Sequence, residues 1–169
     1  MSLLRRFAEN RQGAAAIEFA ILALPFFMVI FAIIEIAIMY FVNSALDEAV
    51  HKTARQVRVG TASANGWNLA TFKAAVCGDL TYLFSCSDNL LVRATVITDM
   101  SSVSKISGIS NGTLSVTEDF NIGGAGDYVL IQAFLPWTPA LQFFSYSSSR
   151  LNDGRYVLSA AELFKNEPF

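Results

Sequence analysis

The sequence predicts an α+β protein in which one long N-terminal helix packs on a small antiparallel β-sheet. Residues 14–42 are almost entirely apolar, and apolar positions continue beyond them at helical spacing. Three later segments, 89–100, 126–137 and 154–164, are rich in Val, Ile, Leu and Tyr, with turn residues between them. After Val42, Ser, Thr, Asn and Asp become common. A hydrophobic N-terminal segment is therefore joined to a domain with an ordinary polar surface.

The apolar run has the length of a membrane-spanning helix. It is interrupted only by Glu18, Pro25 and Glu35, and as a helix it is about 43 Å long, against a hydrocarbon core of about 30 Å. A cleaved secretory signal has a shorter apolar region, of about 7–15 residues, followed by a small-residue cleavage site. No clear site of that kind follows Val42. The segment is predicted to stay in the mature protein.

The charges on the two sides of the run predict its orientation. Arg5, Arg6 and Arg11 precede it, and Asp47 and Glu48 are the first charges after it. By the positive-inside rule the N-terminus stays cytoplasmic and the domain is translocated. The formal net charge of −2 gives no indication of a nucleic-acid partner.

Glu18 is unexpected near the cytoplasmic end of a membrane anchor, where a carboxylate costs about 1–3 kcal/mol. Gly13 stands directly before the apolar run. Cleavage after Gly13 would create an α-amine on Ala14, which is a cation at neutral pH. Glu18 would lie one turn away and would neutralise this amine, or that of a neighbouring copy, in a medium of low dielectric. Glu18 also lies in the first turns of the helix, where the helix dipole favours a negative charge.

Two motifs carry a family resemblance. The string GAAAIEF, at residues 13–19, is similar to the prepilin-peptidase site of type IV pilins and pseudopilins. The longer string at residues 5–27, which includes Pro25, resembles the N-terminus of TadE-like minor pilins of the tight-adherence (Flp-type) pilus system. The closing LFKNEPF, at residues 163–169, resembles the ending of many of these proteins. A lone GxxxxE pattern is weak, but its place at the basic-to-apolar boundary makes it specific.

The resemblance implies a pilin-like architecture and a processing site. A prepilin peptidase would cut between Gly13 and Ala14, and Glu18 and Phe19 would serve processing and subunit register. The chain would then have three parts: a cytoplasmic leader peptide (1–13), a transmembrane and assembly helix (14–42), and a periplasmic pilin-like globular domain (43–169) that includes the second half of the helix (43–59).

The resemblance also implies a structural role in a pilus that serves cell adhesion. The chain would be a component or assembly factor of the pilus, not an enzyme, with no cofactor or metal. Its partners would be the prepilin peptidase, other pilin subunits, the inner-membrane pilus assembly platform and the lipid bilayer. It would reside in the bacterial inner membrane and then in the extracellular pilus. Two alternatives stay open, a signal-anchored periplasmic binding or sensor domain and a pseudopilin of a secretion system.

Two residues of the apolar run allow two interpretations each. Pro25 removes one backbone hydrogen bond, so it marks either a tolerated kink or a point that unwinds during packing into a filament. Glu35 lies about 32 Å beyond Ala14 along the helix, near the outer membrane interface. There it either extends into water or pairs with a basic group on a neighbouring subunit.

Beyond the membrane segment, the helix is predicted to continue to Val59 and to end at Gly60. One stripe of small and apolar residues recurs at helical period, namely Ala45, Leu46, Ala49, Val50, Thr53, Ala54 and Val57. His51 is expected to face solvent on this helix. A second helix is predicted within residues 65–80, with Asn68 as N-cap and Gly78 as its stop.

The remaining predictions concern the domain's second half. Cys77 and Cys86 lie nine positions apart with no second cysteine pair, so a zinc site is poorly supported and export would favour a disulfide. The segment 112–120 is a candidate fourth strand. The aromatic-rich segment 135–149 is either a short helix that closes the core or an apolar patch for a neighbouring subunit.

Overall fold

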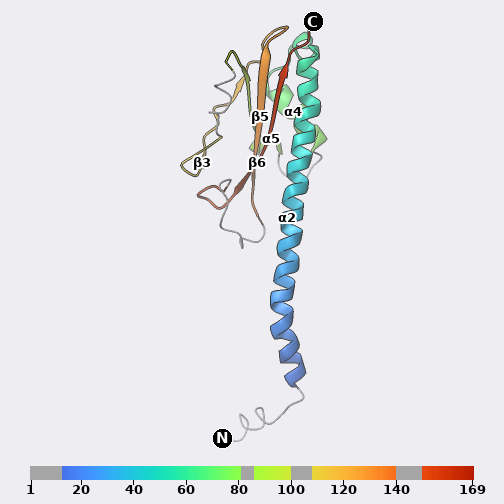
Figure 1. Cartoon of the computed structure of the whole chain (residues 1–169), viewed down its shortest axis with the longest axis vertical. Coiled ribbons are helices and arrows are strands. Elements are labelled where there is room, and N and C mark those ends of the chain that lie inside the picture. Colours follow the sequence, from blue (N-terminus) through green and yellow to red (C-terminus); the bar gives the residue numbers. More distant parts are fainter. Residues whose placement is uncertain (1–12, 81–85, 100–107, 140–149) are drawn as a thin grey trace, which may run out of the picture.

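In the computed structural model a long helix stands beside a β-sheet and extends far beyond it (Figure 1). The structure describes residues 13–80, 86–99, 108–139 and 150–169. The predicted leader up to residue 12 and most of the aromatic-rich segment 135–149 lie outside these ranges. The predicted fold class, a long N-terminal helix packed on a sheet in an α+β pilin-like arrangement, is confirmed.

Helix α2 (Ala14–Arg58) is 45 residues long. Pro25 lies inside it and does not end it. The helix ends where Gly60 adopts a left-handed conformation with φ of 79°, and the Gly60 N–H donates to the carbonyl of Val57 (3.0 Å). Arg55 and Arg58 occupy the last turn, where cations interact favourably with the helix dipole. The predicted helix end is confirmed.

In the described ranges three short helices follow: α3 (Thr61–Ala64), α4 (Leu69–Asp79) and α5 (Cys86–Asn89). Asn68 caps α4 as predicted, because its side chain accepts a hydrogen bond from the Thr71 N–H (2.9 Å). The predicted stop at Gly78 is wrong. The Leu80 N–H still bonds to the carbonyl of Val76 (3.3 Å), so Gly78 lies in the last helical turn.

The main sheet has the strand order β4-β1-β5-β6. Its strands are β1 (Leu91–Val96), β4 (Asp119–Phe120), β5 (Tyr128–Trp137) and β6 (Tyr156–Lys165). The central strand β5 is antiparallel to both neighbours, pairing Ala94 with Ile131 and Ala133 with Ala160. Both faces of β5 are buried, which explains why its sequence alternates only in part.

The edge of the sheet next to β1 differs from the prediction. The segment 112–120 forms two separate two-residue strands, β3 (Thr113–Leu114) and β4. Strand β3 pairs with β2 (Ile109–Ser110) in a separate hairpin, and β4 is parallel to β1. Because the chain passes through this hairpin before it reaches β4, a crossover brings β4 beside β1 in the same direction.

The core lies between α2, α4 and the inner face of the sheet. The helix buries one stripe of side chains, and its first buried residue is Val42 (2% exposed). Strand β6 is the main neighbour of α2 (Figure 1). The core residues come from all three layers: Val42, Leu46, Ala49, Val50, Ala54 and Val57 from α2, Phe72 and Val76 from α4, and Val92, Ile131, Ala133, Leu135 and Ala160 from the sheet.

Candidate functional site

The first half of α2 exposes a continuous apolar surface. Ile17 is 64% exposed and Leu22 is 71% exposed, and most large apolar side chains up to Phe41 are similar. Among the described side chains of α2, burial begins at Val42, which belongs to the core cluster between the helix and the sheet. Exposed apolar surfaces of this extent are binding surfaces for lipid or protein. The helix is long and apolar enough to cross a membrane.

The predicted processing site lies at the start of this helix. Gly13 is the N-cap residue, with φ of −93° and no side-chain cap, and α2 begins at Ala14. A Cβ built on Gly13 meets no atom of the described residues within 4 Å. Neither the backbone conformation nor the space around it requires glycine at this position.

The other predicted residues of the segment follow along the same helix. Glu18 is exposed, and the adjacent Phe19 is 70% exposed. Pro25 is exposed and Glu35 is partly buried. The helix therefore places the two carboxylates about 26 Å apart along its axis, so within one chain they act at separate levels.

The second half of α2 is fixed to the domain by more than core packing. Asn43 accepts a hydrogen bond from the Ser159 N–H through its Oδ1 atom (3.2 Å). Ser159 lies on β6, which is an edge strand. The helix side chain thus satisfies a backbone donor that an edge strand otherwise leaves to solvent.

The closing NEPF motif joins three parts of the fold. Asn166 is 2% exposed, and its Nδ2 donates to the carbonyls of Ile122 (2.8 Å) and Gly124 (2.9 Å). The Glu167 N–H donates to the carbonyl of Arg58 (2.9 Å) at the end of α2. The motif therefore connects β6, the loop before β5 and the helix end, beside which the C-terminus lies (Figure 1).

The last residue of the chain packs on the glycine that ends α2. A Cβ on Gly60 would lie 2.4 Å from Cγ of Phe169. Gly60 is thus required twice, by its left-handed backbone and by the ring of Phe169. The closing motif has a structural role, which the resemblance alone did not indicate.

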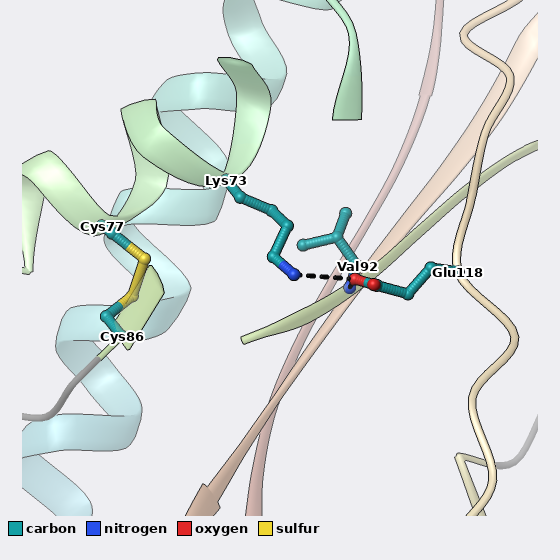
Figure 2. Close-up of polar contacts among 5 residues, drawn as sticks. All are labelled: Lys73, Cys77, Cys86, Val92 and Glu118. Carbon is teal, nitrogen blue, oxygen red and sulfur yellow. Dashed lines mark hydrogen bonds and ion pairs between the residues drawn. A yellow bond between two sulfur atoms is a disulfide. The ribbon is translucent and has the colours of Figure 1, made fainter. Parts of the chain in front are cut away.

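A disulfide and the carboxylate of Glu118 hold α4 near β1 (Figure 2). Cys77 and Cys86 are bonded, with their Cα atoms 5.6 Å apart, so the predicted disulfide is present in this structure. Glu118 accepts from the Val92 N–H (3.0 Å) and pairs with Lys73 (3.0 Å) through the same oxygen. Glu118 thus satisfies the exposed edge of β1 next to β4, as Asn43 does for β6.

His51 is exposed, as predicted, but it is not solitary. Its Nδ1 bonds to the carboxylate of Glu162 on β6. This hydrogen bond and the negative charge of Glu162 raise the pKa of His51 above its ordinary value. The contact spans 111 positions in the sequence, and no local pattern indicated it.

The N-terminal part of the chain is similar to a known protein family. Residues 13–55 match the model of the TadE-like protein family. The predicted TadE-like resemblance is confirmed over these residues. No curated protein and no solved structure matches the chain.

The TadE-like region spans both halves of α2. It begins at Gly13, includes the exposed apolar surface, and ends at Arg55 within the part that packs on the domain. It covers Glu18, Pro25 and Glu35, whereas the disulfide, the sheet and the NEPF motif lie outside it.

Proposed function

We propose that this TadE-like chain is a minor pilin or pseudopilin of a tight-adherence (Flp-type) pilus system, either as a component of the pilus or as a factor required for its assembly. The observation that carries the proposal is the exposed apolar half of α2. Most of its large apolar side chains are exposed in the part of the chain that the structure describes, and the family match begins at the residue directly before the helix. Such a surface suits lipid before assembly and other apolar helices afterwards.

Processing after Gly13 is the second part of the proposal. The fold gives no reason for glycine there, since its φ is an ordinary −93° and a side chain would meet nothing within 4 Å. A requirement for glycine then comes from outside the folded chain, as in the substrate pocket of a peptidase. Prepilin peptidase is the partner that the family resemblance supplies.

The proposed placement follows from the charges and the exposed helix. Residues 1–13 form the cytoplasmic leader, residues 14–42 span the inner membrane, and residues 43–169 form the periplasmic domain. The helix start is retained in the membrane until the inner-membrane assembly platform transfers it among other pilin subunits. The apolar side chains of the helix then contact neighbouring helices instead of lipid.

Glu18 is proposed to set the axial register of the subunit. Cleavage places a cationic amine on Ala14, and Glu18 pairs with that amine on a neighbouring copy. In a low-dielectric surrounding an unpaired carboxylate is costly, so the pairing favours one stagger over others. Pro25 and Glu35 keep their two interpretations under this proposal.

The deciding experiment is N-terminal sequencing of the full-length protein isolated from membranes. A mature start at Ala14 supports the proposal, whereas a start at Met1 or Ser2 overturns it and favours a signal-anchored binding or sensor domain. Gly13→Val is the matched variant. It is expected to abolish cleavage while the domain still folds, because the added side chain meets open space.

The register role of Glu18 is tested by Glu18→Ala with Glu35→Ala as its control. Glu18→Ala is expected to be cleaved at the same bond but to reduce piliation at least about tenfold, a change of about 1.4 kcal/mol or more in assembly. Glu35→Ala isolates the general effect of removing a carboxylate from the helix. Normal piliation of Glu18→Ala would remove the register role and leave the processing proposal intact.

A further inference from the structure

A groove of about 540 Å³ lies between the last turns of α2 and strand β6. The helix contributes three basic side chains to it, His51, Arg55 and Arg58. Glu162 and Glu167 line the opposite wall. The groove therefore combines charges of both signs at the level where the chain ends.

Two of the three basic groups have acidic partners within the groove. His51 bonds to Glu162, and Arg58 Nε lies 3.3 Å from Glu167 Oε1. The guanidinium of Arg55 makes no hydrogen bond or ion pair with any residue of the described ranges. Two of the basic side chains of the groove are thus paired within the chain. The guanidinium of Arg55 can bind a carboxylate from another molecule.

The same helix carries exposed carboxylates two turns earlier. Asp47 and Glu48 are exposed, and within the described part of the chain neither carboxylate makes a hydrogen bond or ion pair. Glu48 precedes Arg55 by seven positions, so the two lie on nearly the same helix face about 10 Å apart along the axis. The order along this face is acid first and base second.

We propose that Arg55 binds the Glu48 carboxylate of a second copy of this chain, displaced by about 10 Å along the helix axis toward the C-terminal end. Asp47 supplies a second negative charge beside it. A parallel, displaced copy presents its acidic turn at the level of the first copy's basic turn, and the same contact repeats with each added copy. This is a heterologous contact that extends instead of closing, as a filament needs.

This inference rests on the proposed function, and the two agree in direction. Pairing of Glu18 with the Ala14 amine of a neighbour needs a displacement of four positions, about 6 Å. The Arg55–Glu48 contact needs seven positions in the same direction. The difference of three positions, about 4.5 Å, is within the reach of a long, extended arginine side chain.

Cross-linking of the full chain in its own membranes and pili tests the contact. The double variant Glu48→Cys/Arg55→Cys is treated with a short thiol-reactive cross-linker whose span matches an Arg–Glu pair. We expect a ladder of covalent multimers, because each copy carries both partners. Each single variant is expected to stay monomeric, and co-expression of the two single variants is expected to give dimers only.

The matched control is Glu48→Cys/Thr113→Cys. Thr113 is exposed on β3, which lies across the sheet from α2 (Figure 1), so this pair is expected to give no ladder. Pili of normal yield that give no ladder with Glu48→Cys/Arg55→Cys would overturn the contact and leave the proposed function in place. A membrane protein that starts at Met1 would overturn the proposed function itself.

If the introduced cysteines prevent assembly, charge-reversal variants test the same contact. Arg55→Glu is expected to reduce piliation at least about threefold, and Glu48→Arg/Arg55→Glu is expected to restore it, because the reversed pair can form between copies. Loss of piliation in Arg55→Glu without recovery in the double variant would contradict the proposal. N-terminal sequencing of each variant confirms that processing is unchanged.

Discussion

Residues 16–41 and residues 42–58 belong to one uninterrupted helix, but their side chains have different surroundings. In the first part Ile17 and Leu22 are 64% and 71% exposed, whereas in the second Leu46 and Val50 are fully buried. The backbone is helical throughout. The comparison shows that core packing stabilises mainly the second half, whereas most large apolar side chains of the first half stay exposed in the part of the chain that the structure describes.

Truncation of a buried side chain is expected to give the largest difference in stability between the two halves of α2. Leu46→Ala removes a fully buried side chain and is expected to lower the free energy of unfolding by about 2–5 kcal/mol. Leu22→Ala, at a 71% exposed position, is expected to leave it unchanged. Denaturant unfolding of the full chain in detergent micelles, followed by tryptophan fluorescence, measures both. Equal losses would show that the first half also packs on the domain.

Removal of the buried amide of the closing motif gives the next effect. Asn166→Ala leaves the carbonyls of Ile122 and Gly124 without their donor and is expected to cost about 1–3 kcal/mol. The control Asn65→Ala removes one exposed hydrogen bond to the Thr61 carbonyl and is expected to cost less than about 0.5 kcal/mol. The same unfolding measurement compares the two variants. Equal losses of stability would show that the NEPF motif does not fix the helix end.

Two glycines with left-handed backbones sharpen the comparison further. Gly60→Ala and Gly66→Ala share a backbone cost of about 1–2 kcal/mol, but only at Gly60 would the new Cβ meet the ring of Phe169. We therefore expect Gly60→Ala to cost about 1 kcal/mol more. In the Phe169→Gly background, which also removes the Phe169 Cβ that would lie 2.8 Å from the added atom, the excess is expected to vanish. An excess that persists there would have another origin.

The smallest effect concerns the pH dependence of the second half. Glu162 raises the pKa of His51 in the folded chain, so the folded state holds this proton more tightly than the unfolded state. The resulting stabilisation is fully present below the ordinary pKa of about 6.5 and is lost as pH rises through the raised value. Because His51 is the single histidine, its NMR titration reports the value directly. Glu162→Gln is expected to return the pKa toward 6.5; no change would contradict the pairing.

The features that the sequence predicted correctly depend on local signals. The helix end at Gly60 and the cap at Asn68 follow from residue types with specific backbone preferences, and the stripe from Ala45 to Val57 follows from helical period. The three main strand segments have composition and turn residues that belong to strands. Cys77 and Cys86 are close in sequence, so their pairing needs no contact between distant segments.

The features that were missed depend on contacts between distant segments. The carboxylate of Glu118 accepts a hydrogen bond from Val92 on β1, 26 positions away in the sequence. His51 bonds to Glu162, which is 111 positions away. The parallel direction of β4 depends on a crossover path that two-residue strands do not reveal. Of the candidate site, the sequence indicated the boundary at Gly13 and the carboxylate of Glu18, but not the groove beside Arg55, because β6 forms its second wall.

The position of β6 has a consequence for biosynthesis. Strand β6 is the main neighbour of the second half of α2, yet it is synthesised after every other helix and strand that the structure describes. A nascent chain therefore presents the apolar stripe of α2 without this neighbour until residues 156–165 have been made. Premature termination before Tyr156 removes the whole strand, so a truncated product keeps the long apolar helix but lacks the strand that covers its stripe, and such exposed apolar surface promotes aggregation. The order of synthesis thus makes the core between the helix and the sheet the last part of the described fold to close.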